Sequence, residues 1–483
     1  MIQKYIGYQL MELFNTKEFL HCFEIMISKT LNQNPAHFDE YEEKIQRLFQ
    51  AGACLFFKMI LESYDDWILK NRDPSVYRNK GKRTNCLKTV FGPVEYTRRI
   101  YQTDQQFVFL LDQSLKITKI GSFSKKATQV LLSEAADKSF RKSAHTSDRA
   151  IGLPVSHQAI WNLKERFGQS VMQKEKIQQK SGIYEPGSVE ATVLFEEVDG
   201  VYLSLQREVS PSKELKVSTC YTGWSEQGKD QFFLQNKLSF AEFTDSMDFH
   251  EKREYAIHSH YNMDTNKARI LNTDGAKWCT DVPYKPTVIQ LDRFHIMRSI
   301  HQNIYHKKMR SWLLELLYKE QPEDLLDVLD TYINSISYMD EWVAKARETK
   351  QYLENHIDQL KSYKTLIDPD LLEADKVYRG MGIQESNNFN LITRRMKHQR
   401  MSWRKRSGNH MVKLLCSIQN GTLEDDINCC FSFVRNEKRL NHIKKNHPKR
   451  KKLKSIGTAK GHIYAGHAIR KLNKSIQNRS ILD

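Results

Sequence analysis

The chain has 483 residues, and its 75 lysines and arginines against 58 aspartates and glutamates give a formal charge of +17. The length predicts about two to four domains, and the content of 40% hydrophobic and 11% aromatic residues excludes a disordered chain. The positive charge favours a polyanionic partner, with nucleic acid ahead of an anionic membrane surface.

Targeting signals and metal-binding cysteine patterns are both weak. No apolar run approaches the roughly 20 residues of a membrane span, and charges interrupt the first residues too early for a signal peptide, so we expect a cytosolic protein. Eight cysteines without a C-x-x-C pair indicate reduced thiols. Cys429 and Cys430 could hold zinc with His442 and His447, but adjacent cysteines chelate one tetrahedral ion poorly, so buried thiols are favoured.

The N-terminal third is expected to be mainly helical. Apolar residues at helical spacing predict a long helix or helix pair over residues 38–69, ended by Asp73-Pro74. The stretch "CLKTVFGPVEYTRRIYQ" then predicts a small hairpin within residues 86–117, with its turn at Gly92-Pro93.

Residues 122–169 favour three short helices that resemble a helix-turn-helix. Ser156 would cap the last helix, and His157 and Gln158 would face DNA base edges. Ile160, Trp161 and Leu163 would anchor this helix to its neighbours. An ordinary three-helix bundle remains the alternative, because helix-turn-helix patterns are weak in a single sequence.

A linker is expected at residues 180–190, followed by strands and then by helices. "TVLFEEVDG", "VYLSLQRE" and "ELKVSTCYTGW", a helix near 240–260, and then "ARILNTDGAKW" and "PTVIQLDRFH" suggest a mixed sheet flanked by helices. Helices are predicted from His295 to about Lys376 and again over roughly 384–435. The tail from Lys438 to Lys454 has nine lysines or arginines and no acid, which is typical of a solvated arm.

The stretch "FEEVDGVYLSLQ" places acids in a run that otherwise reads as a strand. Asp199-Gly200 between alternating apolar residues is a strong two-residue turn signal, so a solvent-facing hairpin is one reading. If the strand alternates, Glu197 and Asp199 share one face while Glu196 points to the other.

Three acids lie where a strand meets a turn or a helix begins, namely Asp199, Asp274 and Glu385. Mg²⁺ takes oxygen ligands and is typically held by a few carboxylates together with substrate phosphate, so this set is a candidate metal and catalytic site. Each acid also has a simpler reading. Asp199 and Asp274 fit turns, and Glu385 suits a helix N-terminus.

Four ordered blocks, "LFEEVDGVYLSLQ", "LNTDGAKW", "LDRFHIMR" and "ESNN...RRMKHQRMSW", resemble those of the ISLre-type bacterial insertion-sequence transposases over about residues 35–435. The resemblance implies a DDE transposase with a ribonuclease-H-like core, whose catalytic and metal-binding acids are Asp199, Asp274 and Glu385. It also implies an all-helical insertion similar to that of Mutator-like and hAT elements. Those elements share a Cys/Asp-x-x-His signature, and the stretch from Asp292 to His295 looks like it. The resemblance therefore implies that Asp292 and His295 support the site, although the two residues could instead simply pair with each other and lock the insertion to the sheet.

A cationic strip follows Glu385 and suits a phosphodiester substrate. Trp403 within it could stack on an unpaired base or pack in the core. The predicted DNA-binding residues, besides His157 and Gln158, are Arg394, Arg395, Lys397, Arg400, Trp403, Arg404, Lys405 and Arg406.

We therefore expect a multidomain α+β transposase that cuts the ends of its element and joins them to target DNA with two Mg²⁺ or Mn²⁺ ions. Its partners would be double-stranded DNA of the terminal inverted repeats and the target, with no membrane and a homodimer or higher multimer on DNA. It would lie in the bacterial cytoplasm, at the nucleoid when bound to DNA. The alternatives are a DNA-binding protein on a disused scaffold and a metal-dependent nuclease that does not join strands.

The expected domains follow from this reading. They are an N-terminal helical region with a small β-hairpin (1–120), a helix-turn-helix-like domain (121–180), the first part of a ribonuclease-H-like mixed α/β core (181–295), an all-helical insertion (296–380), the closing helices of the core (381–435) and a basic tail (436–483).

Overall fold

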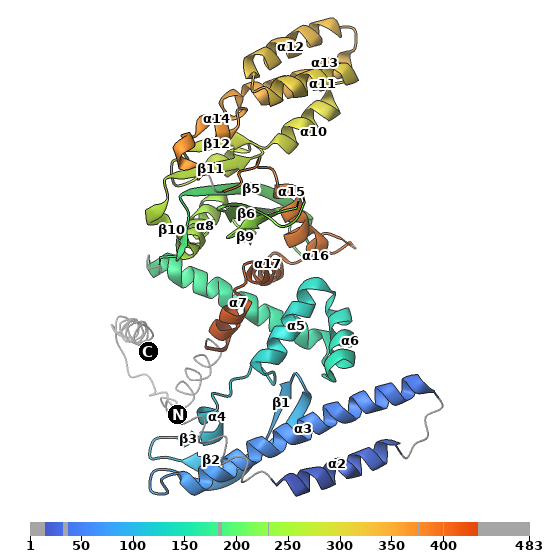
Figure 1. Cartoon of the computed structure of the whole chain (residues 1–483), viewed down its shortest axis with the longest axis vertical. Coiled ribbons are helices and arrows are strands. Elements are labelled where there is room, and N and C mark those ends of the chain that lie inside the picture. Colours follow the sequence, from blue (N-terminus) through green and yellow to red (C-terminus); the bar gives the residue numbers. More distant parts are fainter. Residues whose placement is uncertain are drawn as a thin grey trace, which may run out of the picture. The chain divides into compact units, whose positions relative to one another are not determined.

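The computed structural model describes residues 15–31, 37–181, 186–229, 231–373, 376–398 and 400–432. This part of the chain is mixed α+β, as expected (Figure 1). No helix within it is long and apolar enough to span a bilayer. The predicted basic tail and the zinc candidates His442 and His447 lie outside the described residues. All eight cysteines lie inside them, and each is a free thiol.

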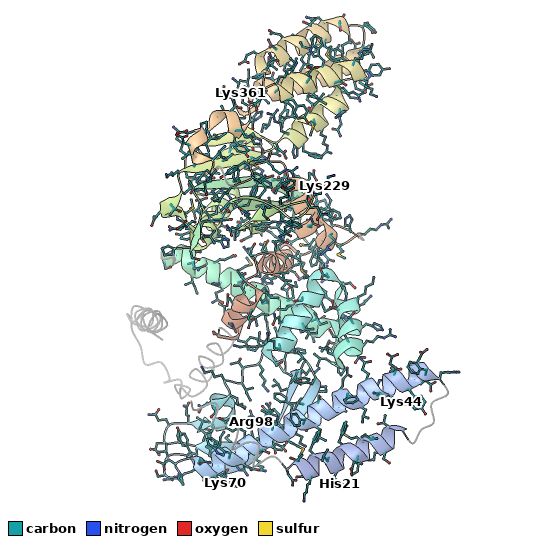
Figure 2. All side chains as sticks on the ribbon, viewed as in Figure 1. His21, Lys44, Lys70, Arg98, Lys229 and Lys361 are labelled. Carbon is teal, nitrogen blue, oxygen red and sulfur yellow. The ribbon has the colours of Figure 1, made fainter. Side chains whose placement is uncertain are left out.

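The N-terminal region combines two helices with a small antiparallel sheet. Its elements are α2 (Thr16–Leu31), α3 (Phe38–Asn71), β1 (Arg78–Thr89), β2 (Gly92–Gln102), β3 (Phe107–Val108) and α4 (Leu110–Ser114). The predicted long helix is confirmed as α3, towards whose two ends Lys44 and Lys70 are labelled in Figure 2. Its buried Leu61, Tyr64 and Ile68 belong to the apolar core that α3 shares with this sheet.

The predicted hairpin is present, but it starts earlier and its turn is displaced. β1 pairs with β2 from Arg78 opposite Gln102 to Thr89 opposite Gly92. Gly92 and Pro93 therefore open β2, and the turn lies at residues 90–91. Gly92 leaves the turn with a φ of +119°, a conformation that favours glycine.

Three helices follow the hairpin, namely α5 (Lys125–Asp137), α6 (Phe140–Ile151) and α7 (His157–Ser181). Ser156 caps α7 as predicted, because its hydroxyl accepts the N–H of Ala159 at 3.1 Å. Ile160 and Leu163 are buried as expected. The prediction that Trp161 packs with them is wrong, because this side of α7 faces solvent and the residue is 36% exposed.

Helix α7 connects the helical region to the central sheet. It has 25 residues and extends to Ser181, so the first residues of the predicted linker are helical. It contacts α5 and α6 and also α8 and α17, and Gln179 near its end donates to Glu251 at 2.7 Å. The use of these helices as a DNA-binding helix-turn-helix stays a prediction.

The central sheet has five strands, β5 (Val193–Ser204), β6 (Ser212–Tyr221), β9 (Leu238–Glu242), β11 (Ala268–Thr273) and β12 (Val288–Leu291). Their order is β12-β11-β5-β6-β9. β5, β6 and β9 pair antiparallel, whereas β11 pairs parallel with both β5 and β12. The break expected at Asp199-Gly200 is wrong, because β5 continues through it. A Cβ at Gly200 would meet the Glu214 side chain on β6, which would have to move.

Smaller elements surround this sheet. They are β4 (Val189–Glu190) paired with β10 (Tyr261–Asn262), β7 (Gly223–Glu226) paired with β8 (Phe232–Gln235), α8 (Ser246–His260), η1 (Met263–Thr265) and α9 (Lys277–Thr280). The predicted helix near 240–260 is α8, which contacts β6 and β9.

The predicted helical region after the sheet is present and has its own apolar core. It comprises α10 (Arg293–Asn303), α11 (Lys307–Tyr318), α12 (Pro322–Ser335) and α13 (Asp340–Glu354), followed by η2 (Ile357–Gln359), α14 (Tyr363–Leu366) and η3 (Pro369–Leu371). Its last residues return to the sheet, where Tyr363 and Met381 pack with Phe195 of β5.

The chain then closes the central region with α15 (Gln384–Asn388), a π-helical turn η4 (Phe389–Thr393), α16 (Arg394–Met396) and α17 (Lys405–Gln419). Residues 423–432 are helical as well. α17 contacts both α7 and β9, and Met411, Val412 and Leu414 on it belong to the largest apolar core.

Candidate active site

Three aspartates lie side by side at one edge of the central sheet. The register aligns Val198 of β5 with Thr273 of β11, and Thr273 with Leu291 of β12. The residue after each aligned position is Asp199, Asp274 or Asp292. These three residues, here called the aspartate row, lie on or directly after three neighbouring parallel strands and are aligned by the pairing of those strands.

The same face of the sheet becomes steadily less polar behind the aspartate row. The next row consists of Glu197, Asn272 and Gln290, all buried. Tyr221 donates to Oε1 of Glu197 at 2.7 Å, and Gln290 donates to Asn272 at 3.4 Å. The third row is the apolar set Phe195, Ile270 and Val288. Hydrogen-bonded polar groups therefore lie between the aspartate row and the apolar core.

Glu196 points to the opposite face, as strand alternation predicts. Its carboxylate is fully buried and forms ion pairs with Arg253 and Arg269, and it accepts a hydrogen bond from Tyr284 at 2.8 Å. Burial alone would raise the pKa of Glu196, but the two guanidinium groups lower it below its ordinary value. Glu196 therefore has a structural partner set of its own and does not belong to the aspartate row.

Helix α15 brings Glu385 and Asn388 to the aspartate row. Asn388 donates from Nδ2 to Oδ2 of Asp199 at 2.6 Å, and Glu385 lies three residues earlier, on the exposed side of the helix. Burial raises the pKa of Asp199 to about 6. The hydrogen bond from Gly200 and the charge of His295 lower this pKa, whereas the charges of Asp274 and Glu385 raise it further. Asp199, Asp274 and Glu385, far apart in sequence, thus interact electrostatically.

The Asp292–His295 pair lies at the same place. His295 Nε2 is 3.9 Å from Oδ2 of Asp292, while Oδ1 accepts the N–H of Phe294 and caps α10 at 3.0 Å. Burial raises the pKa of Asp292, and the charges of Glu385 and Asp274 act in the same direction. Mutual pairing, the simpler function expected of these two residues, is therefore compatible with a place beside the acids.

Helix α13 holds the loop that carries Asp274. Tyr352 donates its hydroxyl to the carbonyl oxygen of Asp274 at 2.9 Å, and His356 Nε2 lies 3.1 Å from the carbonyl oxygen of Gly275. Gly275 has a φ of +89°, and a Cβ there would lie 2.6 Å from His356. Sequence reasoning missed Tyr352, His356 and Asn388. Only Asn388 left a local signal, its position one helical turn after Glu385.

The donor chemistry of the site suits a hard divalent ion. Asp199, Asp274 and Glu385 offer carboxylate oxygens, and the pKa of Asp199 is raised mainly by burial, with smaller contributions from the charges of Asp274 and Glu385. Within the described residues, however, no three histidine, cysteine, aspartate or glutamate side chains converge closely enough to hold an ion. The three carboxylates therefore influence one another electrostatically, and the described structure does not hold them as a formed coordination shell.

The predicted DNA-binding residues are not equally accessible. His157 and Gln158 are exposed at the start of α7. Arg395 is buried and donates from Nε to the carbonyl oxygen of Ala135 at 2.9 Å. Trp403 is also buried and donates to the carbonyl oxygen of Met396, so its core alternative is confirmed. The exposed members of the strip are Arg394, Lys397, Arg400, Arg404 and Arg406, and Lys405 is half-buried.

Comparison with known proteins gives a family without an assigned activity. The model of an uncharacterised protein family, UPF0236, matches residues 31–429. A "UPF0236 protein in vanSb 3'region" of Streptococcus gallolyticus is 24% identical over 396 residues, covering 80% of this chain and 84% of that protein. A UPF0236 protein of Caldanaerobacter subterraneus, whose name joins eleven numbered designations, is 22% identical over 421 residues, with 84% and 82% covered.

Proposed function

The chain belongs to the uncharacterised protein family UPF0236, and we propose that it is a DDE-type DNA transposase that cuts the ends of its own element and joins them to target DNA. The observation that carries the proposal is the aspartate row with Glu385 beside it. Phosphoryl transfer depends mainly on positioning and electrostatic stabilisation, which clustered carboxylates supply through bound cations.

The order of the central strands supports a ribonuclease-H-like core. Three antiparallel strands are followed by α8 and then by two strands parallel to the first, in the order β12-β11-β5-β6-β9. This is the strand arrangement expected of that fold. The helices α10 to α13 would then be the all-helical insertion between Asp274 and Glu385 that the sequence resemblance implies.

Each acid has a definable task in such a site. Asp199, Asp274 and Glu385 would hold the divalent ions, with Asn388 fixing one oxygen of Asp199 and Tyr352 fixing the Asp274 backbone. When bound, Mg²⁺ or Mn²⁺ would favour ionisation of the attacking water or hydroxyl and neutralise the charge that develops on the phosphate. Asp292 would add negative charge at the same edge of the sheet.

The reaction has two displacements at phosphorus. Water attacks the phosphodiester at the element end and releases a 3′ hydroxyl, leaving the phosphate on the other side of the cut. That hydroxyl then attacks a phosphorus of target DNA and displaces a target 3′ hydroxyl, so bonds are exchanged without an external energy source. The +17 net charge of the chain supports a polyanionic substrate.

The name of the Caldanaerobacter relative gives further support. It joins eleven designations under one protein name, as expected of a sequence present in many copies in one genome. A protein encoded by a mobile element would have this property, whereas a housekeeping nuclease would not need it.

The test is to incubate the full chain with DNA that flanks its own gene, an unrelated plasmid and Mn²⁺, and to map nicked and joined products. We expect nicks at the element ends and covalent joining to the plasmid, both lost in Asp274→Asn and retained in Asp281→Asn, an exposed aspartate control. Nicks without joining would indicate a nuclease. Binding without nicks by the wild type would indicate a disused scaffold and overturn the proposal.

A further inference from the structure

A hollow of about 520 Å³ lies among α6, α7, the residues after β5 and the segment before α17. Its lining includes Phe140, Trp161, Arg207, Trp403 and Arg404, and it contains no member of the aspartate row. Its volume falls within the roughly 300–1,000 Å³ of small-molecule sites. The proposed reaction does not use it.

Two loops build the hollow, and hydrogen bonds hold them together. Gln206 donates its backbone N–H to the carbonyl oxygen of Trp403 at 2.9 Å, and its side chain donates to the carbonyl oxygen of Ser402 at 2.9 Å. Lys405 donates its backbone N–H to Glu208 at 2.9 Å. The hollow is therefore a fixed feature of the described structure, formed by segments about 200 residues apart.

One aromatic residue of the lining is accessible. Trp161 is 36% exposed on the solvent side of α7, whereas Trp403 is buried. Lys164 Nζ lies 5.6 Å from the centre of the Trp161 ring. An accessible indole offers a flat surface on which a base can stack.

The charged part of the lining is mainly positive. The guanidinium of Arg395 lies 5.4 Å from the ring centres of both Phe140 and Trp403, and the residue is only 5% exposed. Within the described residues Arg395 forms no ion pair with a carboxylate, and neither do Arg207 and Arg404, which are exposed at the hollow.

The acids near this hollow are already engaged. Glu165 is shared by Lys164, Ser407 and His410, and Glu208 accepts from the Lys405 backbone. Positive charge therefore remains available to an anionic ligand at the exposed Arg207 and Arg404, and the buried Arg395 adds to the positive potential of the hollow.

We propose that this hollow binds one unpaired nucleotide of a DNA strand, with the base stacked on Trp161 and the phosphate held by Arg404 and Arg207 above Arg395. A nucleotide is the ligand class that needs both an aromatic face and clustered guanidinium groups. The exposed Arg400 and Arg406 nearby in sequence favour a continuing strand over a free mononucleotide. The inference rests on the proposed function for the choice of DNA.

The test measures binding by the full chain in EDTA, so that cleavage plays no part. The probes are a blunt DNA duplex and the same duplex with a one-nucleotide 3′ overhang of 2-aminopurine, compared at one salt concentration by fluorescence anisotropy. We expect at least about fivefold tighter binding of the overhang duplex and quenching of the 2-aminopurine. Trp161→Ala should abolish both effects and leave affinity for the blunt duplex unchanged, whereas Trp161→Phe should keep most of the preference.

The matched control is Trp312→Ala, which removes another exposed tryptophan, 50% exposed on α11, and should change neither effect. Equal affinity of the wild type for both duplexes, or a preference that survives in Trp161→Ala, would overturn the inference. Cleavage competence is scored separately with Mn²⁺. A protein that prefers the overhang without cutting DNA contradicts only the proposed function, and one that cuts without the preference contradicts only this inference.

Discussion

Asp199→Asn should stabilise the metal-free protein at pH 8 by roughly 2–3 kcal/mol. The pKa of Asp199 is raised from 3.8 to about 6, mainly by burial, with Asp274 and Glu385 adding to the shift. Each pKa unit corresponds to about 1.4 kcal/mol. Because the folded-state pKa is the higher one, the contribution of Asp199 to stability is fully present below about pH 3.8 and is lost as the pH rises through 6.

An asparagine at this position keeps the shape and carries no charge, so the variant should not lose stability over that pH window. It can still accept the hydrogen bond from Asn388, which donates to Asp199 at 2.6 Å. The assay is urea unfolding followed by circular dichroism at pH 4 and pH 8, in EDTA. The difference between variant and wild type should be large at pH 8 and small at pH 4.

Adding Mn²⁺ at pH 8 should reverse the comparison. The ion stabilises only proteins that bind it in the folded state, so the wild type should gain stability and Asp199→Asn should gain little. Asp281→Asn is the control and should behave as the wild type in every condition. Destabilisation of Asp199→Asn at pH 8 in EDTA, or the same stability difference at both pH values, would refute the electrostatic reasoning.

Three further predictions address the surroundings of the site. Glu196→Gln should lower the free energy of unfolding by roughly 3–5 kcal/mol in urea titrations, because two buried arginines lose the fully buried carboxylate that they share and keep Glu254 as a carboxylate partner; a loss below about 1 kcal/mol would contradict this. Burial raises the pKa of Glu197 to about 7, so its contribution to stability is full below pH 4.5 and is lost as the pH rises through 7. Glu197→Gln should therefore flatten the decline in melting temperature between pH 5 and 8, and an unchanged slope would count against it. Replacing His157 and Gln158 with alanine should reduce discrimination between element ends and random DNA more than total affinity in filter binding, whereas equal losses would favour a plain helical bundle.

Local patterns were sufficient for most helices and for two strands of the central sheet. The long helix α3, the serine cap of α7 and the strands β11 and β12 all follow from residue spacing and capping chemistry that operate within a few residues. Alternation along β5 also separated Glu196 from Glu197 and Asp199, as their different partners confirm. Where the local signal was ambiguous, as at Asp199-Gly200, the turn chemistry suggested a hairpin although the strand continues.

Long-range pairing decided the rest. The sequence by itself determined that acids follow Val198, Thr273 and Leu291, but only the parallel register of three strands places those acids in one row. It suggested that Trp403 could stack on a base and that Trp161 would anchor its helix, but packing decided that Trp161 is accessible and Trp403 buried. The physical reason is that periodicity and capping depend on neighbours in sequence, whereas register, ion pairing and exposure depend on residues that meet only after the chain has folded.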